Sequence, residues 1–382
     1  MVPAAIAAMT EQLRHTGNSS SLHSAGRATK RVIEEAREQL AQAVGARPSE
    51  IVFTAGGTEA DNLAVQGLFH ARHRADRNRT MIVISSIEHH AVLDPALWLE
   101  QQEVAQVCLL PVDELGRVQL GALAELLGRD HARIALISVM WANNEVGTIQ
   151  PIGEITRLAA QYDIPVHTDA VQAVGHIPVG FESSGAGCLT LTGHKLGGPM
   201  GAGALLVRRD LALDPLFHGG GQERGLRSGT PDAAALTGFA VAASQAVEDL
   251  PESIIRISAL RDRLIDAVFA AVPDAVLRGD PAPTGRLPGN ALFTFAGCEG
   301  DSLLYLLDAR GVACSTGSAC QAGVPQPSHV LLAMGVPEVE ARGALRFSLG
   351  WDSVPDDVDA LAGVIGPVVD RARSAGLAAG IA

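Results

Sequence analysis

A short apolar run that ends in glycine, histidine and lysine stands near the middle of the chain, Cys188-Leu189-Thr190-Leu191-Thr192-Gly193-His194-Lys195. Helical periodicity separates several runs of this kind, as at Lys30–Val44 and Ala60–Leu68. Buried runs that alternate with helices are typical of a mostly parallel sheet covered on both faces, so we predict an α/β fold for the first two-thirds of the chain. The predicted strands are Ile51–Thr54, Met81–Ser85, Arg133–Val139, Ile164–Thr168, Cys188–Leu191 and Gly203–Val207.

The pattern changes near Pro251. Helical segments at Ser253–Val272 and Asp301–Ala309 alternate with short strands at Asn290–Phe295 and Ala344–Leu349, which is typical of a separate α+β domain. A length of 382 residues fits two domains of about 100–200 residues each. We place a large domain at residues 5–250. A smaller C-terminal domain comprises residues 251–382 together with the first few N-terminal residues.

Composition excludes several classes of protein. Lys and Arg number 29 against 42 Asp and Glu, and a net charge of −13 argues against nucleic acid or an anionic membrane as the principal partner. No apolar run reaches the ~18–20 residues of a membrane span, and Met1–Met9 lacks the cationic start of a signal peptide. The five cysteines are odd in number and widely scattered, which argues against a disulfide scaffold and predicts a cytoplasmic protein.

Lysine is rare in this chain. Of the 29 basic residues only Lys30 and Lys195 are lysines. Arginine cannot lose its proton to become a nucleophile, so a lysine kept in an arginine-rich chain indicates that an amine is needed there. Lys195 follows directly on a predicted strand, where ligands of parallel sheets bind.

Polar side chains follow five of the predicted strands. Taken singly, each has a simpler interpretation: His89 as a loop histidine, Asp169 as a helix cap, Lys195 as a surface charge. Because the carboxyl ends of parallel strands meet at one edge of the sheet, the five clusters together indicate one shared site. They are Gly56-Gly57-Thr58-Glu59, Glu88-His89-His90, Asn143-Asn144-Glu145, Asp169 with Gln172, and Thr192-Gly193-His194-Lys195.

Pyridoxal phosphate requires this set of groups. It needs a lysine amine for covalent attachment, an acidic partner for its ring nitrogen, a phosphate cradle, a flat side chain over the ring and a donor to its phenolic oxygen. These roles are available, in order, from Lys195, Asp169, Gly57 with Thr58, His89 and Gln172. A metal site is the competing interpretation, but it explains neither Lys195 nor the glycine turn. Its ligands would be Glu88, His89, His90, His167 and Asp169.

With these motifs the sequence resembles, over nearly its whole length, the pyridoxal-phosphate-dependent cysteine desulfurases of the iron–sulfur-assembly and nitrogenase type, in the class V aminotransferase family. The resemblance implies a fold-type-I homodimer that acts on L-cysteine. The matching motifs are Gly17-Asn18-Ser19-Ser20-Ser21-Leu22-His23, Phe53-Thr54-Ala55-Gly56-Gly57-Thr58-Glu59-Ala60-Asp61-Asn62, Glu88-His89-His90-Ala91-Val92-Leu93, Asn143-Asn144-Glu145-Val146-Gly147, His167-Thr168-Asp169-Ala170-Val171-Gln172, Gly193-His194-Lys195, His218-Gly219-Gly220-Gly221-Gln222-Glu223-Arg224, Arg227-Ser228-Gly229-Thr230, Ser315-Thr316-Gly317-Ser318-Ala319-Cys320 and Arg346-Phe347-Ser348-Leu349-Gly350.

The resemblance also implies roles around the cofactor. Lys195 would hold pyridoxal 5'-phosphate and then act as the base on the substrate Cα. Asp169 would keep the ring nitrogen protonated, and His89 would stack on the ring and take part in proton transfer. Gln172 and Asn144 would lie near the phenolic oxygen and the substrate. The phosphate ligands would be Gly57, Thr58, Thr192 and His194, with Thr230 from the other subunit.

On the substrate side, the resemblance implies that Arg346 binds the α-carboxylate as a bidentate pair, which lysine could not reproduce. Cys320 would take the sulfur as a persulfide and leave alanine. The acceptor of that sulfur would be an iron–sulfur scaffold protein or a thiolation enzyme. Cys320 lies in a run of small residues, 314–323, that predicts a loop, whereas the remaining cysteines adjoin apolar segments.

Two departures from the family accompany the resemblance. Relatives usually carry serine where this chain has Thr192, whose hydroxyl is retained. They also begin with a short strand ending in an Ala-Thr-Thr-Pro turn, whereas this chain begins at Met1-Val2-Pro3, where that turn would end. The alternatives are a selenocysteine lyase or another β-lyase, and a catalytically weakened sulfur-carrier partner. A direct lyase can dispense with Cys320, and a carrier needs neither Lys195 nor Asp169.

Overall fold

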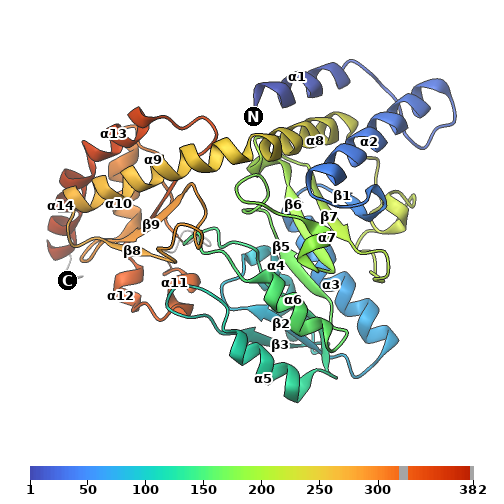
Figure 1. Ribbon diagram of the computed structural model, residues 1–382, viewed down its shortest axis with the longest axis horizontal. Helices are drawn as coiled ribbons and strands as arrows, with labels where there is room; N and C mark the ends of the chain where they lie inside the picture. Colours follow the sequence, from blue (N-terminus) through green and yellow to red (C-terminus); the bar gives the residue numbers. More distant parts are fainter. Residues whose placement is uncertain (318–325, 379–382) are drawn as a thin grey trace. The chain divides into compact units, whose positions relative to one another are not determined.

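The larger sheet of the computed structural model, which describes residues 1–317 and 326–378, is built from short runs buried on both faces. It has seven strands in the order β1-β7-β6-β5-β4-β2-β3 (Figure 1). Six of them are buried at every residue, and only β3 at the edge is partly exposed. The bounds are β1 Ile51–Thr54, β2 Met81–Ser85, β3 Gln106–Leu110, β4 Ile134–Ser138, β5 Val166–Asp169, β6 Cys188–Thr192 and β7 Gly203–Val207. The predicted α/β fold is confirmed.

Strand direction gathers the polar motifs at one edge of the sheet. Strands β2 to β6 are parallel, whereas β7 is antiparallel to both of its neighbours, β6 and β1. Two antiparallel steps leave β1 running in the direction of β6. The carboxyl ends of β1, β6, β5, β4 and β2 therefore lie at the same edge, which is where open α/β sheets bind ligands.

Some helices pack directly on this sheet, and others pack on neighbouring helices. α3 packs on β4 to β7 and also on α4, around a core that includes Leu68, Phe69 and Ile82. α1 and α2 both pack on α8 (Figure 1). The bounds are α1 Pro3–Gln12, α2 Ser24–Ala43, α3 Gly57–Ala75, α4 His90–Gln101, α5 Leu120–Asp130, α6 Ile152–Ala160, α7 Phe181–Ser184 and α8 Ala233–Glu248, with short turns η1 Pro48–Glu50, η2 Gly193–Lys195 and η3 Glu223–Gly225.

The described chain forms two compact units. Unit 1 comprises Met1–Leu110, Gln119–Trp141 and Gln150–Leu250, and unit 2 comprises Pro111–Val118, Ala142–Ile149 and Pro251–Ala382. Two short segments from the predicted large domain thus belong to unit 2. The N-terminal residues, expected with the smaller domain, belong to unit 1, because Val2 N–H donates to Gly197 O at 2.7 Å and α1 packs on α8.

Unit 2 is built on a three-stranded antiparallel sheet in the order β10-β9-β8. Its core surrounds Phe293, whose ring contacts those of Phe269, Phe295 and Phe347. The strands are β8 Val276–Arg278, β9 Asn290–Thr294 and β10 Ala344–Ser348. The helices are α9 Leu250–Ala271, α10 Gly300–Asp308, α11 His329–Ala333, α12 Glu338–Ala341, α13 Pro355–Ala362 and α14 Ile365–Ala378.

The predicted element boundaries differ from the observed ones in identifiable ways. Strands β3 and β8 were not predicted, and both are partly exposed, unlike the six predicted strands of the large sheet. α2 begins at Ser24 rather than Lys30, since His23 Nδ1 accepts the Gly26 N–H at 3.2 Å and caps the helix. None of the helices in residues 1–317 and 326–378 combines the length and apolar character needed to cross a bilayer.

Candidate active site

Three predicted site residues lie at the ends of adjacent strands in unit 1. Asp169 is the last residue of β5, Thr192 is the last residue of β6, and Lys195 follows in η2. Strands β5 and β6 are in parallel register, with Asp169 opposite Thr190. The amine and the carboxylate predicted to act on one cofactor therefore come from neighbouring strand ends.

Asp169 and Lys195 also interact electrostatically. The Asp169 side chain is buried, and burial raises its pKa to about 6, although the Val171 N–H and the Lys195 charge both lower it. Asp169 Oδ1 accepts the Val171 N–H at 2.9 Å, and Oδ2 has no hydrogen bond among the described residues. Lys195 is exposed, and its charge contributes to lowering the pKa of His176 and His194. A cation placed against Asp169 would favour its ionised form.

The start of α3 meets these strand ends. Gly56 caps the helix with φ +152°, a conformation that L side chains rarely adopt, and offers no side chain to the first-turn N–H groups. A Cβ at Gly57 would lie 3.0 Å from Val171 Cγ2 and 3.7 Å from Thr192 Cβ. Thr192 Oγ1 lies 3.1 Å from His194 Nδ1. Backbone N–H groups at a helix start, beside hydroxyl and imidazole donors, form an environment suited to phosphate.

The other cofactor candidates of unit 1 remain accessible at the same edge. His89 caps α4 through Nδ1, which accepts the Ala91 N–H at 3.1 Å, and its ring is exposed. Thr58 is exposed in the first turn of α3, and Gln172 is half-buried just after β5. Thr230 is exposed at the end of the segment 218–230.

A buried polar cluster beneath Asp169 was not assigned to the cofactor site from sequence. His167 bonds through Nδ1 to Ser138 Oγ at 2.8 Å and through Nε2 to Thr190 Oγ1 at 3.0 Å. Burial lowers the pKa of His167 to about 3, so the ring is neutral. Burial also raises the pKa values of Asp61 and Glu88, and repulsion from Asp169 adds to both shifts. The sequence signal was a set of polar residues inside or beside apolar strands.

The five alternative metal ligands are engaged separately. Glu88 Oε1 accepts the Met140 N–H at 2.7 Å, and His90 Nδ1 lies 2.9 Å from Asp94 Oδ1. His167 is held by two hydroxyl groups, as described above. Within residues 1–317 and 326–378, no three His, Cys, Asp or Glu side chains form a group suited to a metal ion.

The predicted substrate residues meet in unit 2. An η nitrogen of Arg346, in β10, donates to Asn144 O at 2.7 Å. Arg346 is half-buried, and burial lowers its pKa while the charge of Glu145 opposes that shift. Sequence reasoning placed Asn144 at a strand end of the large domain, whereas residues 142–149 belong to unit 2. Cys320 lies outside the described residues.

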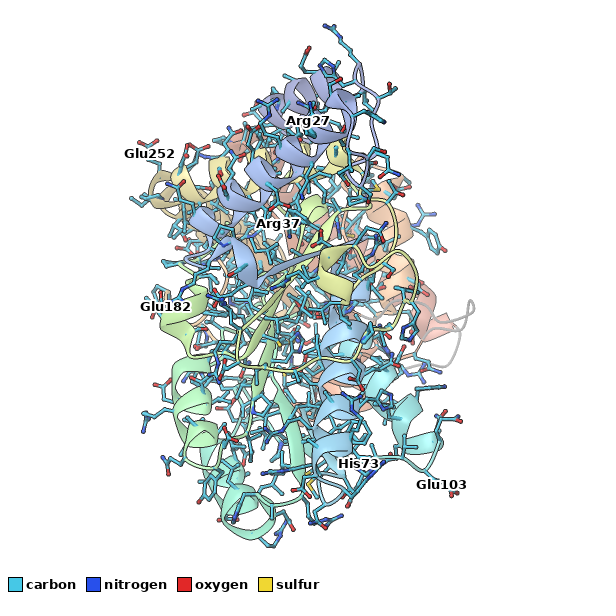
Figure 2. The ribbon with its side chains drawn as sticks, turned by 90° about the vertical axis from the view of Figure 1, so that its right-hand side faces the viewer. Arg27, Arg37, His73, Glu103, Glu182 and Glu252 are labelled. Carbon is cyan, nitrogen blue, oxygen red and sulfur yellow. The ribbon has the colours of Figure 1, made fainter. Side chains whose placement is uncertain are left out.

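Side-chain bonds fix the segment 218–230 to the edge strand β1. Arg37, labelled on α2 in Figure 2, donates to the Glu223 carboxylate at 2.7 and 2.9 Å. The same carboxylate accepts the Phe53 N–H at 2.9 Å. Further along the segment, Arg227 Nε donates to Glu59 Oε1 in α3 at 2.7 Å. These bonds cover a free sheet edge and hold the segment that carries Thr230.

Comparison with known proteins gives concordant matches over nearly the whole chain. The model of the aminotransferase class-V family matches residues 1–361. The IscS-like cysteine desulfurase of Mycobacterium tuberculosis is 56% identical over 379 residues, covering 99% of this chain and 96% of the relative. A solved NifS-like protein is 33% identical with a TM-score of 0.88 and covers 97% of this chain and 96% of its own. A structure described as SspA in complex with cysteine is 33% identical with a TM-score of 0.77, covering 91% and 95%.

Proposed function

Because this chain belongs to the class-V aminotransferase family, as a cysteine desulfurase of the IscS/NifS type, we propose that its unit 1 site binds pyridoxal 5'-phosphate and that Lys195, Asp169 and Cys320 carry the reaction. The observation that carries the proposal is the placement of Lys195 beside the buried carboxylate of Asp169, at the ends of adjacent strands. An amine and a buried carboxylate at adjacent strand ends are two of the groups that this cofactor requires.

The donor set fits the cofactor. The first turn of α3, with Thr192 and His194, offers backbone N–H, hydroxyl and imidazole groups to a phosphate. Asp169 would pair with the protonated ring nitrogen, and the exposed ring of His89 would lie over the cofactor. Gln172 and Asn144 would act near the phenolic oxygen. When bound, the cofactor supplies an electron sink for the pair released at the substrate Cα.

The protein's own groups bind the substrate and move its protons. Arg346 would pair with the α-carboxylate of L-cysteine, and a solved structure of similar fold is described as a complex with cysteine. The Lys195 amine, once free, would take the Cα proton, because an amine can act as a base where a guanidinium cannot.

The proposed transfer of sulfur to Cys320 balances in atoms and electrons. The Cys320 sulfur forms a bond to the sulfur of L-cysteine while the Cβ–Sγ bond of the substrate breaks. The electron pair of the broken bond goes to Cβ, which gains a proton, so the products are L-alanine and a Cys320 persulfide. No external oxidant or reductant is needed at this step.

The proposed assembly is a homodimer in which Thr230 reaches the phosphate in the other subunit. Thr230 ends a segment that is fixed by the Arg37–Glu223 and Arg227–Glu59 pairs but is itself exposed. Large apolar side chains exposed in unit 1 favour association: Ile6, Leu13, Leu22, Met200 and Phe217. Sedimentation of the loaded enzyme should give twice the chain mass, and a fully active monomer would refute the dimer.

The sulfur acceptor in this proposal is an iron–sulfur scaffold protein or a thiolation enzyme, since the relative with 56% identity is IscS-like. A cytoplasmic location is part of the same proposal. The odd number of cysteines supports it, and so do the free thiols of Cys108, Cys188, Cys298 and Cys314.

One assay tests the catalytic proposal. The purified holoenzyme is incubated with L-cysteine and a thiol reductant, and alanine and sulfide are quantified together. Equimolar alanine and sulfide are expected, with a persulfide on Cys320 detected by mass spectrometry when the reductant is left out. Pyruvate and ammonia in place of alanine would indicate a β-lyase, and a strong preference for selenocysteine would indicate a selenocysteine lyase.

A further inference from the structure

Glu145 is a buried carboxylate in unit 2 for which sequence analysis gave no role. Its side chain is 4% exposed. Its backbone is fixed on both sides, because Asn143 Oδ1 accepts the Glu145 N–H at 2.9 Å and Asn290 Nδ2 donates to Glu145 O at 3.0 Å. These bonds fix the backbone position from which the Glu145 side chain projects.

The carboxylate bonds to Ser328 and lies close to Gly317, both distant from it in sequence. Glu145 Oε2 accepts the Ser328 hydroxyl at 2.5 Å, and Ser328 Oγ in turn accepts the Leu331 N–H at 3.2 Å as the cap of α11. A Cβ added at Gly317 would lie 2.8 Å from the same Oε2, so glycine gives this oxygen its space. Gly317 and Ser328 stand in the sequence on either side of Cys320.

The same part of unit 2 holds Arg346 on two sides. The Arg346 backbone pairs with Ser315, with N–H···O distances of 2.7 and 3.1 Å. Its guanidinium donates to Asn144 O at 2.7 Å, next to Glu145, and its Nε is buried with no partner among the described residues. Arg346 is therefore joined by its backbone to the 315–317 side and by its side chain to the 144–145 segment.

We propose that Glu145 is a positioning residue, which orients Arg346 toward the substrate carboxylate and fixes Gly317 and Ser328 on either side of the cysteine segment. The proposal rests on the proposed function, because it takes Arg346 as the carboxylate ligand and Cys320 as the nucleophile. One buried carboxylate then links substrate binding to the two described ends of that segment.

The charge of Glu145 has a direct effect on Arg346. Burial raises the pKa of Glu145 to about 7, while the Ser328 hydrogen bond and the Arg346 charge lower it. Above that pH the ionised carboxylate offsets the positive charge of Arg346, which weakens its attraction for a substrate carboxylate. The groups facing Glu145 from α11 and β9, Ser328 and Asn290, are neutral. His329 follows Ser328 in α11. A His329→Asn variant therefore distinguishes an effect of this histidine on KM from an effect of Glu145.

The first experiment measures steady-state kinetics of the holoenzyme between pH 6 and 8.5. In the wild type, KM for L-cysteine should rise as pH passes about 7. Glu145→Gln keeps an acceptor for Ser328 without the charge, so the rise should disappear while kcat stays close to the wild-type value. Glu145→Ala should lower kcat/KM about tenfold, chiefly through KM. Glu338→Gln, which removes an exposed partner of Arg342, is the matched control and should change nothing.

The second experiment needs no activity. Cleavage by proteinase K, a protease of broad specificity, between Gly317 and Ser328 is followed by mass spectrometry on the cofactor-free protein. Glu145→Ala and Ser328→Ala should both be cleaved several times faster than wild type, and Glu145→Gln should be cleaved at about the wild-type rate. Ser328→Ala also keeps the test informative if Glu145→Ala does not fold.

Unchanged KM and unchanged cleavage in both alanine variants would overturn the proposal. So would a Glu145→Gln enzyme that keeps the full KM rise with pH while His329→Asn loses it. A wild-type enzyme that makes no alanine would instead refute the proposed function, and the cleavage experiment would still decide whether Glu145 fixes the two ends.

Discussion

The guanidinium of Arg227 donates two hydrogen bonds to the carboxylate of Glu59, with Nε 2.7 Å from Oε1 and an η nitrogen 3.3 Å from Oε2. Glu59 stands in the first turn of α3, and its Oε2 also accepts the Ala55 N–H at 2.8 Å. The pair ties the segment that leads to Thr230 to the helix start proposed to bind phosphate. It also balances a negative charge that would otherwise repel that phosphate.

Arg227→Ala should therefore weaken cofactor retention, with an expected rise in the pyridoxal phosphate Kd of about tenfold. Removing the carboxylate that has lost its partner as well, in Arg227→Ala/Glu59→Gln, should recover part of that loss because the repulsion disappears. Both are measured by release of the cofactor absorbance on dilution. Arg208→Ala, which breaks an exposed pair with Asp210, is the control. A double variant as weak as the single one would assign the pair a purely structural role.

The lysine assignment has a simple internal control. Lys195→Ala should abolish the covalent cofactor absorbance and all turnover, whereas Lys30→Ala, which removes the other lysine from an exposed position on α2, should change neither. Borohydride reduction followed by peptide mass analysis locates the modified lysine. A reducible adduct that persists in Lys195→Ala would refute the assignment, since only Lys30 could then carry it.

Asp169→Asn should separate cofactor binding from catalysis. Lys195 and the phosphate groups still hold the cofactor, but the ring nitrogen loses the carboxylate that keeps it protonated, so turnover should fall by about two orders of magnitude or more. Visible absorbance reports binding and alanine release reports turnover. The control is Asp163→Asn, whose side chain is 93% exposed. Near-normal alanine release would mean that the acidic partner lies elsewhere.

Cys320→Ser tests the sulfur-transfer step. The variant should bind the cofactor and L-cysteine but neither accumulate a persulfide nor release alanine at the wild-type rate. Cys314→Ser is the matched control, because burial raises the pKa of the Cys314 thiol to about 11 and makes it a poor nucleophile. Alanine production by Cys320→Ser at the wild-type rate would show that sulfur leaves the substrate without a Cys320 persulfide, and would refute this step.

His167 should make the cofactor-free protein sensitive to acid. Its pKa falls from 6.5 to about 3 on burial, so the unfolded chain binds a proton that the folded one rejects, and stability drops as pH falls below 6.5. The expected loss between pH 6.5 and 4.5 is about 2 kcal/mol.

Urea unfolding of the wild type and of His167→Gln at several pH values measures this contribution. The difference in unfolding free energy should depend on pH in that window. The buried carboxylates of Asp61, Glu88 and Asp169 act in the opposite direction, because their raised pKa values favour the folded state as pH falls. They are common to both proteins and largely cancel in the difference. Parallel pH profiles would show that His167 is not the responsible group.

The sequence alone determined the parts of this protein that depend on local pattern. Six largely apolar runs predicted six strands of the large sheet, because a strand buried on both faces consists mostly of apolar residues. The rarity of lysine singled out Lys195, and the polar residues that follow five of these runs located the edge at which Asp169 and Thr192 lie. Hydrophobic periodicity, the apolar runs that become buried and the chemistry of each side chain can all be recognised in the sequence.

Only the tertiary structure decided which distant residues meet. Arg346 contacts Asn144 across 202 positions, and Ser328 contacts Glu145 across 183, because residues 142–149 leave the large sheet and join unit 2. Hydrogen bonds of this kind leave no periodic pattern in the sequence, because each requires only one donor and one acceptor. The buried carboxylate of Glu145 owes its role to the packing of unit 2, where burial and a neighbouring guanidinium act on a side chain that looks ordinary in the sequence.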